Sequence, residues 1–229
     1  MNINPDIAAS VSLLSEPSRA AILMALMDGR FHTASELAYM AAIKPQTASF
    51  HLAKLNEGNL VKVEKHGRHR YYSLANSEIA GILESLLAIS RPPEIRSLNQ
   101  STQTKALREA RTCYDHLAGN LGVRLTTNMV KAGYLEKKGM AYQVTAEGER
   151  FFTAFGLDLQ AIRKRRRAFS RACLDWSERH HHLAGALGEA IAGRLFDLEW
   201  IARVPTSRAV KITEAGRRGF AKHFGLQLK

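Results

Sequence analysis

Residues 33–74 constrain the fold of this chain more than any other segment. Thr33 stands before an apolar helical pattern and Glu36 follows three positions later, which is the sequence signature of a capping box at a helix start. Pro45 predicts the start of a second helix, because a proline in the first helical turn gives up no hydrogen bond. We expect Gly58 to end that helix.

A basic hairpin pattern follows the two predicted helices. Residues 60–65 and 70–74 have the composition of short strands, and residues 66–69 form a turn between them. A short helix pair followed by a basic hairpin is an arrangement that holds one helix in the major groove of DNA. We therefore expect this segment to bind DNA. The alternative is a solvated helix beside an exposed turn.

The second predicted helix has a packed face and an exposed face. Ala48, Leu52 and Leu55 share one side and should pack on the body of the domain. Glutamine and serine can bond base edges, phenylalanine can touch a thymine methyl group, and basic residues at a hairpin tip suit phosphates. His51 lies at the edge of the packed face, where a structural or phosphate-bonding role is favoured. The residues expected to contact DNA are Gln46, Thr47, Ser49, Phe50 and Lys54 of the helix, and Lys65, Arg68 and Arg70 of the hairpin.

Five segments in this part of the chain carry a family likeness. They are LSEPSRAAIL at 14–23, ELA at 36–38, QTASFHLAKL at 46–55, GNLV at 58–61 and GRHRYYSL at 67–74. In this order they resemble the ArsR/SmtB family over about residues 7–90. The resemblance implies a winged helix-turn-helix fold. It also implies a bacterial repressor, usually a homodimer, that releases DNA when it binds a metal or another signal.

The sensor residues of that family are missing from their usual places. Where many members carry a Cys-x-Cys in the first helix of the motif, this chain has Ala38-Tyr39-Met40. The second helix has no thiol, and residues 79–89 offer only Glu84. A signal, if this chain receives one, must therefore enter elsewhere.

The net positive charge of the chain comes entirely from the second part of the sequence. The formal net charge is +12, yet residues 1–90 hold eight basic and eight acidic residues, whereas residues 91–229 hold 25 and 13. This balance favours an anionic partner. The densest run is Arg163-Lys164-Arg165-Arg166-Arg167. It suits either flanking phosphates, each of which adds about −0.9 to the salt slope, or a solvated helix face.

Composition and length indicate a cytoplasmic chain with more than one domain. No segment reaches the roughly 18 uninterrupted apolar residues of a membrane helix. Two cysteines are too few for a disulfide scaffold, so a reducing compartment is expected. The 229 residues suffice for two domains. We expect no membrane partner.

Two apolar stripes suit a homodimer interface. Ile7, Val11 and Leu14 recur at helical spacing near residues 7–14, and a second stripe runs through residues 79–89. Core burial within one subunit explains either stripe equally. A protein that reads half-sites usually does so as a twofold dimer, so we expect dimerisation through these helices.

The second half of the chain contains an internal repeat. RTCYDHLAGNLG at 111–122 is echoed by RACLDW at 171–176 and HLAGALG at 182–188, and later segments are echoed in the same order. We expect each unit to be a helix-hairpin-helix resembling a winged helix, and the two units to pack as a pseudo-twofold pair. The expected domains are residues 1–90 for DNA binding and dimerisation, 91–104 for a linker, 105–160 for the first repeat and 161–229 for the second.

Both cysteines occupy equivalent places in the repeats. Cys113 and His116 are three residues apart, which would put them on one face of a helix. Cys173 is followed by three histidines, of which His182 completes the candidate metal set. Thiolate and imidazole are ligands that zinc, cadmium or lead would accept. A buried structural cysteine is the commoner alternative, and a redox pair is the third.

These observations predict a mainly α chain with small β-hairpins, of the α+β class. Its expected function is sequence-specific binding of double-stranded operator DNA, as a dimeric repressor whose C-terminal half senses a metal, redox or small-molecule signal. The alternative is a module that docks proteins through winged helices. No nucleophile elbow, phosphate loop or metalloprotease helix is found, so we expect no enzymatic activity.

Overall fold

The computed structural model describes residues 6–91, 94 and 97–228. It divides into Met1–Leu83 and Glu84–Lys229, the N-terminal and C-terminal parts. The predicted linker begins at residue 91, and its residues 92, 93, 95 and 96 lie outside the described residues. From Leu98 the chain is helical, so the prediction of a linker as far as residue 104 is wrong. Polar residues suggested a linker there, but they belong to a helix capped by the Ser97 hydroxyl.

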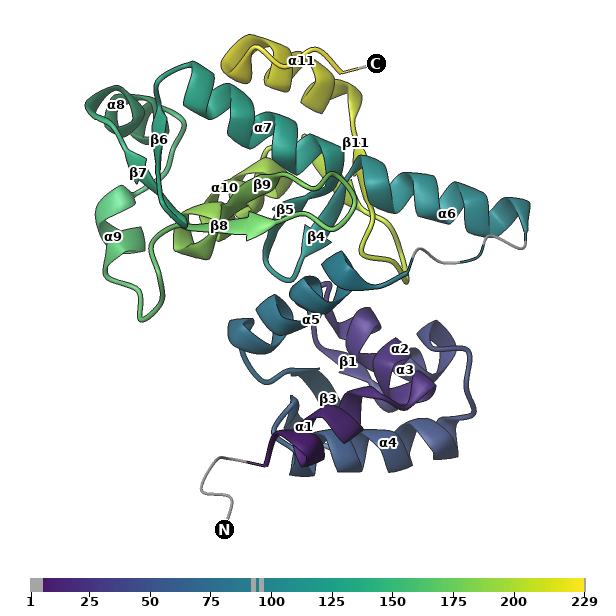
Figure 1. Ribbon diagram of the computed structural model, residues 1–229. Coiled ribbons are helices and arrows are strands. Elements are labelled where there is room, and N and C mark those ends of the chain that lie inside the picture. Colours follow the sequence, from purple (N-terminus) through teal and green to yellow (C-terminus); the bar gives the residue numbers. More distant parts are fainter. Residues whose placement is uncertain (1–5, 92–93, 95–96, 229) are drawn as a thin grey trace. The chain divides into compact units, whose positions relative to one another are not determined.

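The N-terminal part is a winged helix-turn-helix, as predicted (Figure 1). Its three strands form one antiparallel sheet in the order β1-β3-β2. Helices α2, α3 and α4 pack around the fully buried side chains of Leu23, Leu37 and Leu52. The elements are α1 (Ile7–Leu14), α2 (Pro17–Leu26), β1 (His32–Thr33), α3 (Ala34–Met40), α4 (Pro45–Glu57), β2 (Val61–His66), β3 (His69–Leu74) and the first turns of α5 (Ser77–Ile89).

Local signals set the ends of the two central helices. Thr33 and Glu36 form the reciprocal capping box at the start of α3, and Pro45 opens α4. Helix α4 ends before Gly58, as predicted, but for a different reason. Gly58 has a φ of −81°, and the left-handed residue is Asn59 with a φ of 55°. A Cβ at Gly58 would lie 2.2 Å from Leu13 Cδ1 of α1, so a larger residue there would have to displace the Leu13 side chain.

The C-terminal part contains two matching units, each a hairpin, a helix, a second hairpin and a second helix. The prediction of helix-hairpin-helix units therefore lacked the hairpin that opens each one. The first unit is β4 (Arg111–Cys113), β5 (His116–Ala118), α7 (Gly119–Lys131), β6 (Leu135–Lys138), β7 (Ala141–Val144) and α8 (Ala146–Ala154). The second is β8 (Arg171–Leu174), β9 (His181–Ala184), α10 (Gly185–Asp197), β10 (Ile201–Arg203), β11 (Val210–Ile212) and α11 (Glu214–Phe224). Helices α6 (Leu98–Glu109) and α9 (Leu159–Arg163) precede them.

The two units pack reciprocally. Helix α7 of the first lies on β9 of the second, α10 of the second lies on β5 of the first, and β5 and β9 are neighbours (Figure 1). A single apolar core runs through both units and includes Leu121, Phe152, Leu187 and Phe220. This is the packing expected of a pseudo-twofold pair. It brings the two opening hairpins, and therefore both cysteines, to the centre of the C-terminal part.

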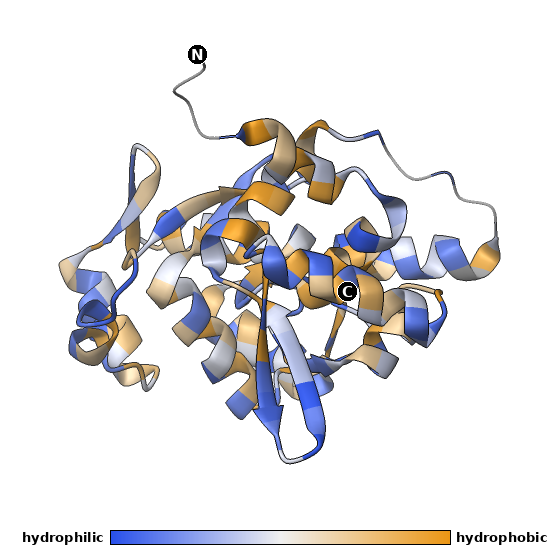
Figure 2. Cartoon of the chain, turned by 90° about the horizontal axis from the view of Figure 1, so that it is seen from below, coloured by the Kyte–Doolittle hydropathy of each residue, from blue (hydrophilic) through white to orange (hydrophobic). Residues whose placement is uncertain are grey.

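Several apolar side chains remain outside the core. In the N-terminal part, α1 next to the N-terminus is largely hydrophobic (Figure 2), and its Ile7 and Val11 are 75% and 53% exposed. On α5, Ile82, Leu86 and Ile89 are exposed as well. No helix in the described ranges combines the length and the hydropathy needed to cross a bilayer.

Candidate functional site

The outward face of α4 presents the residues predicted to read DNA. Gln46, Ser49, Phe50 and Lys54 are exposed and Thr47 is half-buried. Ala48, Leu52 and Leu55 face the core and are fully buried. The Lys54 ammonium lies 4.6 Å from the centre of the Phe50 ring, so these two side chains support each other on the surface.

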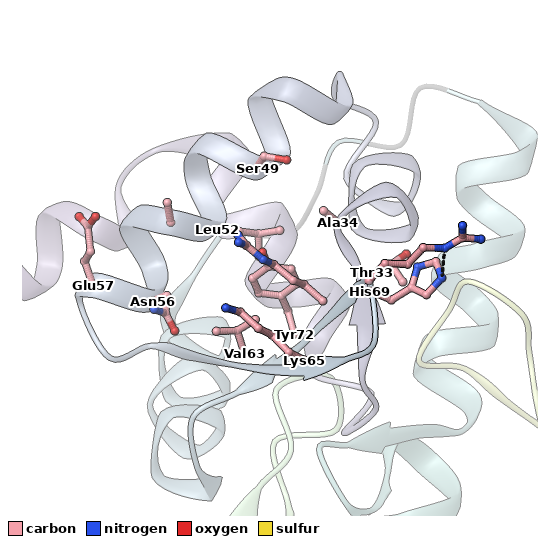
Figure 3. Close-up of a pocket in the computed structure, with 13 residues that line it drawn as sticks. Thr33, Ala34, Ser49, Leu52, Asn56, Glu57, Val63, Lys65, His69 and Tyr72 are labelled. Carbon is pink, nitrogen blue, oxygen red and sulfur yellow. Dashed lines mark hydrogen bonds between the residues drawn. The ribbon is translucent and has the colours of Figure 1, made fainter.

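The wing carries the remaining predicted contacts, and a groove separates it from α4. Lys65 and Arg70 are paired across β2 and β3 near the tip of the hairpin, and Arg68 lies in the turn; all three are exposed. The groove has a volume of 590 Å³. Figure 3 shows its walls, which come from α4, from β2 and β3, and from the start of α3. Asn56 and His69 also line it, and neither was among the predicted DNA contacts.

His51 belongs to the scaffold behind this face. Its ring is largely buried, and Nε2 lies 3.4 Å from the Glu16 carboxylate at the start of α2. Glu16 also caps α2 by accepting from the Arg19 backbone N–H at 2.8 Å. This contact connects α4 to α2, and it fits the structural role favoured from the sequence.

The basic run is largely paired within the C-terminal part. Arg163 forms an ion pair with Glu149, Arg165 pairs with Glu189 at 2.9 Å, and Arg167 contacts both Glu189 and Asp115. Lys164 and Arg166 are exposed. These pairs satisfy most of the charge within the C-terminal part. Only Arg163 belongs to α9, so the predicted helix face does not extend over residues 164–167. DNA contact by this run stays a prediction.

The two cysteines lie on strands and not on helices. Cys113 ends β4 and faces His116 on β5 as a cross-strand pair, so the predicted shared helical face is wrong. Cys173 on β8 faces His182 on β9 in the same way. Each repeat thus supplies one cysteine and one histidine from equivalent hairpins.

The candidate metal residues converge. Their potential ligand atoms all lie within 4.8 Å of one another, and the residues are at most 7% exposed. The Nε2 atoms of His116 and His182 are 3.1 Å apart. The arrangement therefore contains two sulfur and two nitrogen donors pointing at a common centre. The four residues are Cys113, His116, Cys173 and His182.

Each of the two histidines has a carboxylate close to its Nδ1 atom, and each of these carboxylates also contacts an arginine. His116 Nδ1 lies 3.1 Å from the Asp115 carboxylate, which also accepts from Arg167. His182 Nδ1 lies 3.5 Å from Asp175 Oδ2, which is longer than a good hydrogen bond. The Nδ1 atoms therefore face carboxylates, while both Nε2 atoms face the centre.

Asp175 is held by a fully buried arginine. Arg111 is fully buried, and its Nη2 donates to Asp175 Oδ2 at 2.9 Å. The guanidinium also lies 4.6 Å from the centre of the Trp176 ring and 3.9 Å from the Glu84 carboxylate. Asp175 accepts further bonds from backbone N–H groups, including that of Gly119 at 2.7 Å. The Arg111–Asp175 pair joins the two repeats.

The electrostatics of the cluster favour one thiolate. The hydrogen bond donated by Cys113 lowers the pKa of the Cys173 thiol strongly, and both histidines add to this effect. The same hydrogen bond, together with burial, raises the pKa of Cys113. Burial alone would lower the pKa of His116, but Asp115 and the Cys173 thiolate raise it to about 9.

The supporting residues were not identified as such from the sequence. Both repeats contain the pattern Arg-x-Cys-x-Asp, which includes Arg111 and Asp115 in the first and Asp175 in the second. In the structure Arg111 reaches the aspartate of the other repeat. The matching Arg171 is exposed.

Comparisons with known proteins agree with this architecture. A family model described as a helix-turn-helix domain matches residues 14–64. The chain is 53% identical over 226 residues to "Uncharacterized HTH-type transcriptional regulator YdfF" of Bacillus subtilis (strain 168), covering 99% of this chain and all of that one. The chain therefore belongs to the HTH-type transcriptional regulators, and its N-terminal part is an ArsR-like winged helix-turn-helix. It is a DNA-binding regulator of transcription.

Solved structures match only part of the chain. NolR from Sinorhizobium fredii is 26% identical and matches 39% of this chain and 95% of its own, with a TM-score of 0.35. The cadmium metal-sensor CMTR from Mycobacterium tuberculosis is 29% identical and matches 40% of this chain and all of its own, with a TM-score of 0.33. The family assignment rests on the full-length Bacillus relative.

Proposed function

We propose that this protein is a dimeric repressor that reads its operator with α4 and the wing and responds to a signal received in the C-terminal part. The observation that supports it most is the polar, exposed face of α4 beside a basic wing, in a chain related over its whole length to an HTH-type regulator. A helix presented in this way can read base edges, while basic side chains of the wing hold phosphates.

The proposed dimer uses the apolar residues that one chain leaves uncovered. Ile7 and Val11 on α1, and Ile82 and Leu86 on α5, are large and exposed. A second copy of the chain would cover them through the same surface, as in any twofold interface. Two recognition helices related by that axis would read two half-sites of one operator.

The proposed signal enters at the buried cysteine–histidine cluster. Its donors suit a thiolate-binding metal such as zinc, cadmium or lead, and oxidation of the two thiols is the redox alternative. Within the C-terminal part, Arg111 and Arg208 both approach Glu84 of α5, Arg208 at 3.0 Å. The earlier turns of α5 belong to the N-terminal part. A change at the cluster therefore has a continuous helix through which to act.

Replacing Gln46 by alanine tests base reading. We expect a loss of about 1–3 kcal/mol in operator binding and relaxed preference at one base position, because the amide bonds a base edge. Selection of binding sites from random DNA, together with titration of the selected site, measures both effects. Gln160→Ala removes the same group from the exposed start of α9 and should change neither. An unaltered base preference in Gln46→Ala would exclude this role.

Removing the wing arginines tests phosphate contact. Arg68→Ala and Arg70→Ala should weaken specific and non-specific DNA binding by similar factors and make each salt slope shallower by about one unit. Affinity measured over a series of salt concentrations gives the slope. Arg218→Ala on α11, whose side chain is 70% exposed, is the matched control. Arg165→Ala in the same series reports whether the basic run touches DNA. Binding that is insensitive to salt would indicate a protein-docking module instead.

A further inference from the structure

We propose that Cys113, His116, Cys173 and His182 form a closed, four-ligand site for a zinc-class divalent ion. The regulatory role of this metal site rests on the proposed function, whereas metal binding itself can be measured without DNA.

The distances suit tetrahedral coordination. Zinc–nitrogen and zinc–sulfur bonds of about 2.0–2.3 Å place neighbouring ligand atoms roughly 3.3–3.8 Å apart in a tetrahedron. The two Nε2 atoms are 3.1 Å apart, and all four ligand atoms lie within 4.8 Å of one another. Small side-chain adjustments are enough to close the site. Because the four residues are almost completely buried, the protein would supply the whole coordination sphere.

Charge and ligand type select the metal. Binding of the ion would release the protons of Cys113 and His116 to solvent. The resulting two thiolates and two neutral imidazoles neutralise a divalent ion, whereas a monovalent ion would leave a net negative charge in a buried site, which is unfavourable. Thiolates favour soft metals, and imidazole suits zinc, copper, iron and nickel. Zinc satisfies both preferences and accepts tetrahedral geometry without strain. The mixed donor set therefore favours zinc over lead.

The second, independent observation is the orientation of the histidines. A metal-ligating histidine characteristically directs its other ring nitrogen to a carboxylate, a carbonyl or water, which fixes the tautomer. Asp115 and Asp175 occupy this place behind His116 and His182. The gap of 3.5 Å at His182 leaves Nδ1 without a good partner. Binding through Nε2 would make Nδ1 a donor to Asp175. The two aspartates are therefore positioning residues.

The ligands come equally from both repeats. Cys113 and His116 belong to β4 and β5, and Cys173 and His182 belong to β8 and β9. An ion at the centre would therefore join the two opening hairpins across the pseudo-twofold pair. Binding of the ion would therefore affect how the two repeats pack on each other, and its effect would not be limited to one loop.

The test uses the full-length chain, reduced and stripped with a chelator, then titrated with zinc chloride and with cobalt(II) chloride as a spectroscopic probe. We expect one ion per chain, a tetrahedral cobalt spectrum with thiolate charge-transfer bands, and displacement of cobalt by zinc. Cys173→Ser and His182→Gln should lose these bands. His180→Gln, which changes an exposed neighbour of the site, should keep them.

The supporting aspartate gives a separate measurement. Asp115→Asn should retain one ion per chain but bind zinc about 10–100-fold more weakly in competition with a chelator, as expected for loss of an orienting partner. Zinc should also protect both thiols of the unmodified chain from disulfide formation. The absence of a stoichiometric cobalt–thiolate spectrum, or equal rates of thiol oxidation with and without zinc, would overturn the proposal. Operator binding by that chain would still stand, so the two failures are distinguishable.

Discussion

Replacement of Arg111 by methionine is expected to lower the free energy of unfolding of the C-terminal part by about 3–5 kcal/mol, the usual effect of breaking a buried ion pair from one side. Arg111 and Asp175 are both fully buried and are joined at 2.9 Å. Methionine fills part of the space but leaves the Asp175 carboxylate without its cation. Because the pair also connects the two repeats, their packing should weaken together.

The chain provides its own probe for this measurement. Both of its tryptophans, Trp176 and Trp200, lie in the C-terminal part. Urea denaturation of the full-length protein, followed by tryptophan fluorescence in the presence of chelator and reductant, therefore reports on that part alone. Fluorescence of Trp176 should change in the folded variant too, because the Arg111 guanidinium lies against its ring.

The internal repeat offers a matched control. Arg171 stands at the position equivalent to Arg111 but is exposed, so Arg171→Met should change the free energy of unfolding by no more than about 0.5 kcal/mol. Similar losses in both variants would show that the effect comes from removing a positive charge and not from breaking the buried pair.

Much of the N-terminal part follows from local signals. The capping box of Thr33 and Glu36, the proline that opens α4 and the alternating strands of the wing each act within a few residues. Such signals are readable from the sequence because the interactions behind them are short-range. The packed face of α4 also follows from its period, with Ala48, Leu52 and Leu55 at no measurable exposure.

The hairpins that hold the cysteines could not be predicted in the same way. The turn between β4 and β5 is formed by Tyr114 and Asp115, and Tyr114 has a φ of 62°. A bulky aromatic residue rarely adopts this left-handed conformation. Because the turn contains no glycine or asparagine, the sequence contains no signal from which to predict it. The spacing from Cys113 to His116 then fitted a helix equally well. The four candidate ligands were nevertheless identified, because the repeat placed both cysteines at equivalent positions.

The supporting network lies beyond what the sequence pattern shows. Arg111 and Asp175 are 64 positions apart, although Asp115 lies only four residues from Arg111 in the sequence. Arg167, read from the sequence as part of a basic surface run, instead holds Asp115 in the C-terminal part. Reciprocal packing of the two repeats decides these partners, and local sequence carries no signal for it.

Zinc is expected to change the operator affinity of the metal-free protein by about 5–150-fold, which corresponds to a coupling free energy of roughly 1–3 kcal/mol. We expect weaker binding, as the resemblance of the N-terminal part to the ArsR/SmtB family implies. The proposed route starts at the hairpins that carry Cys113 and Cys173 and runs through Arg111, which contacts both Asp175 and Glu84 of α5. Titration of upstream DNA with and without zinc, at fixed ionic strength, measures the effect.

The double variant Cys113→Ser/Cys173→Ser separates sensing from DNA binding. It should bind the operator as tightly as the metal-free parent and show no response to zinc, because its substitutions lie in the C-terminal part and the proposed DNA-reading residues are in α4 and the wing. His180→Gln should respond as the parent does. If cobalt spectra show an occupied site while operator affinity stays constant, the ion has a structural role between the repeats. DNA binding would then respond to a signal other than this metal. If affinity changes equally in the double variant, zinc acts at another place on the chain. A response that requires both thiols therefore distinguishes a sensor at the cluster from a metal that only stabilises the fold.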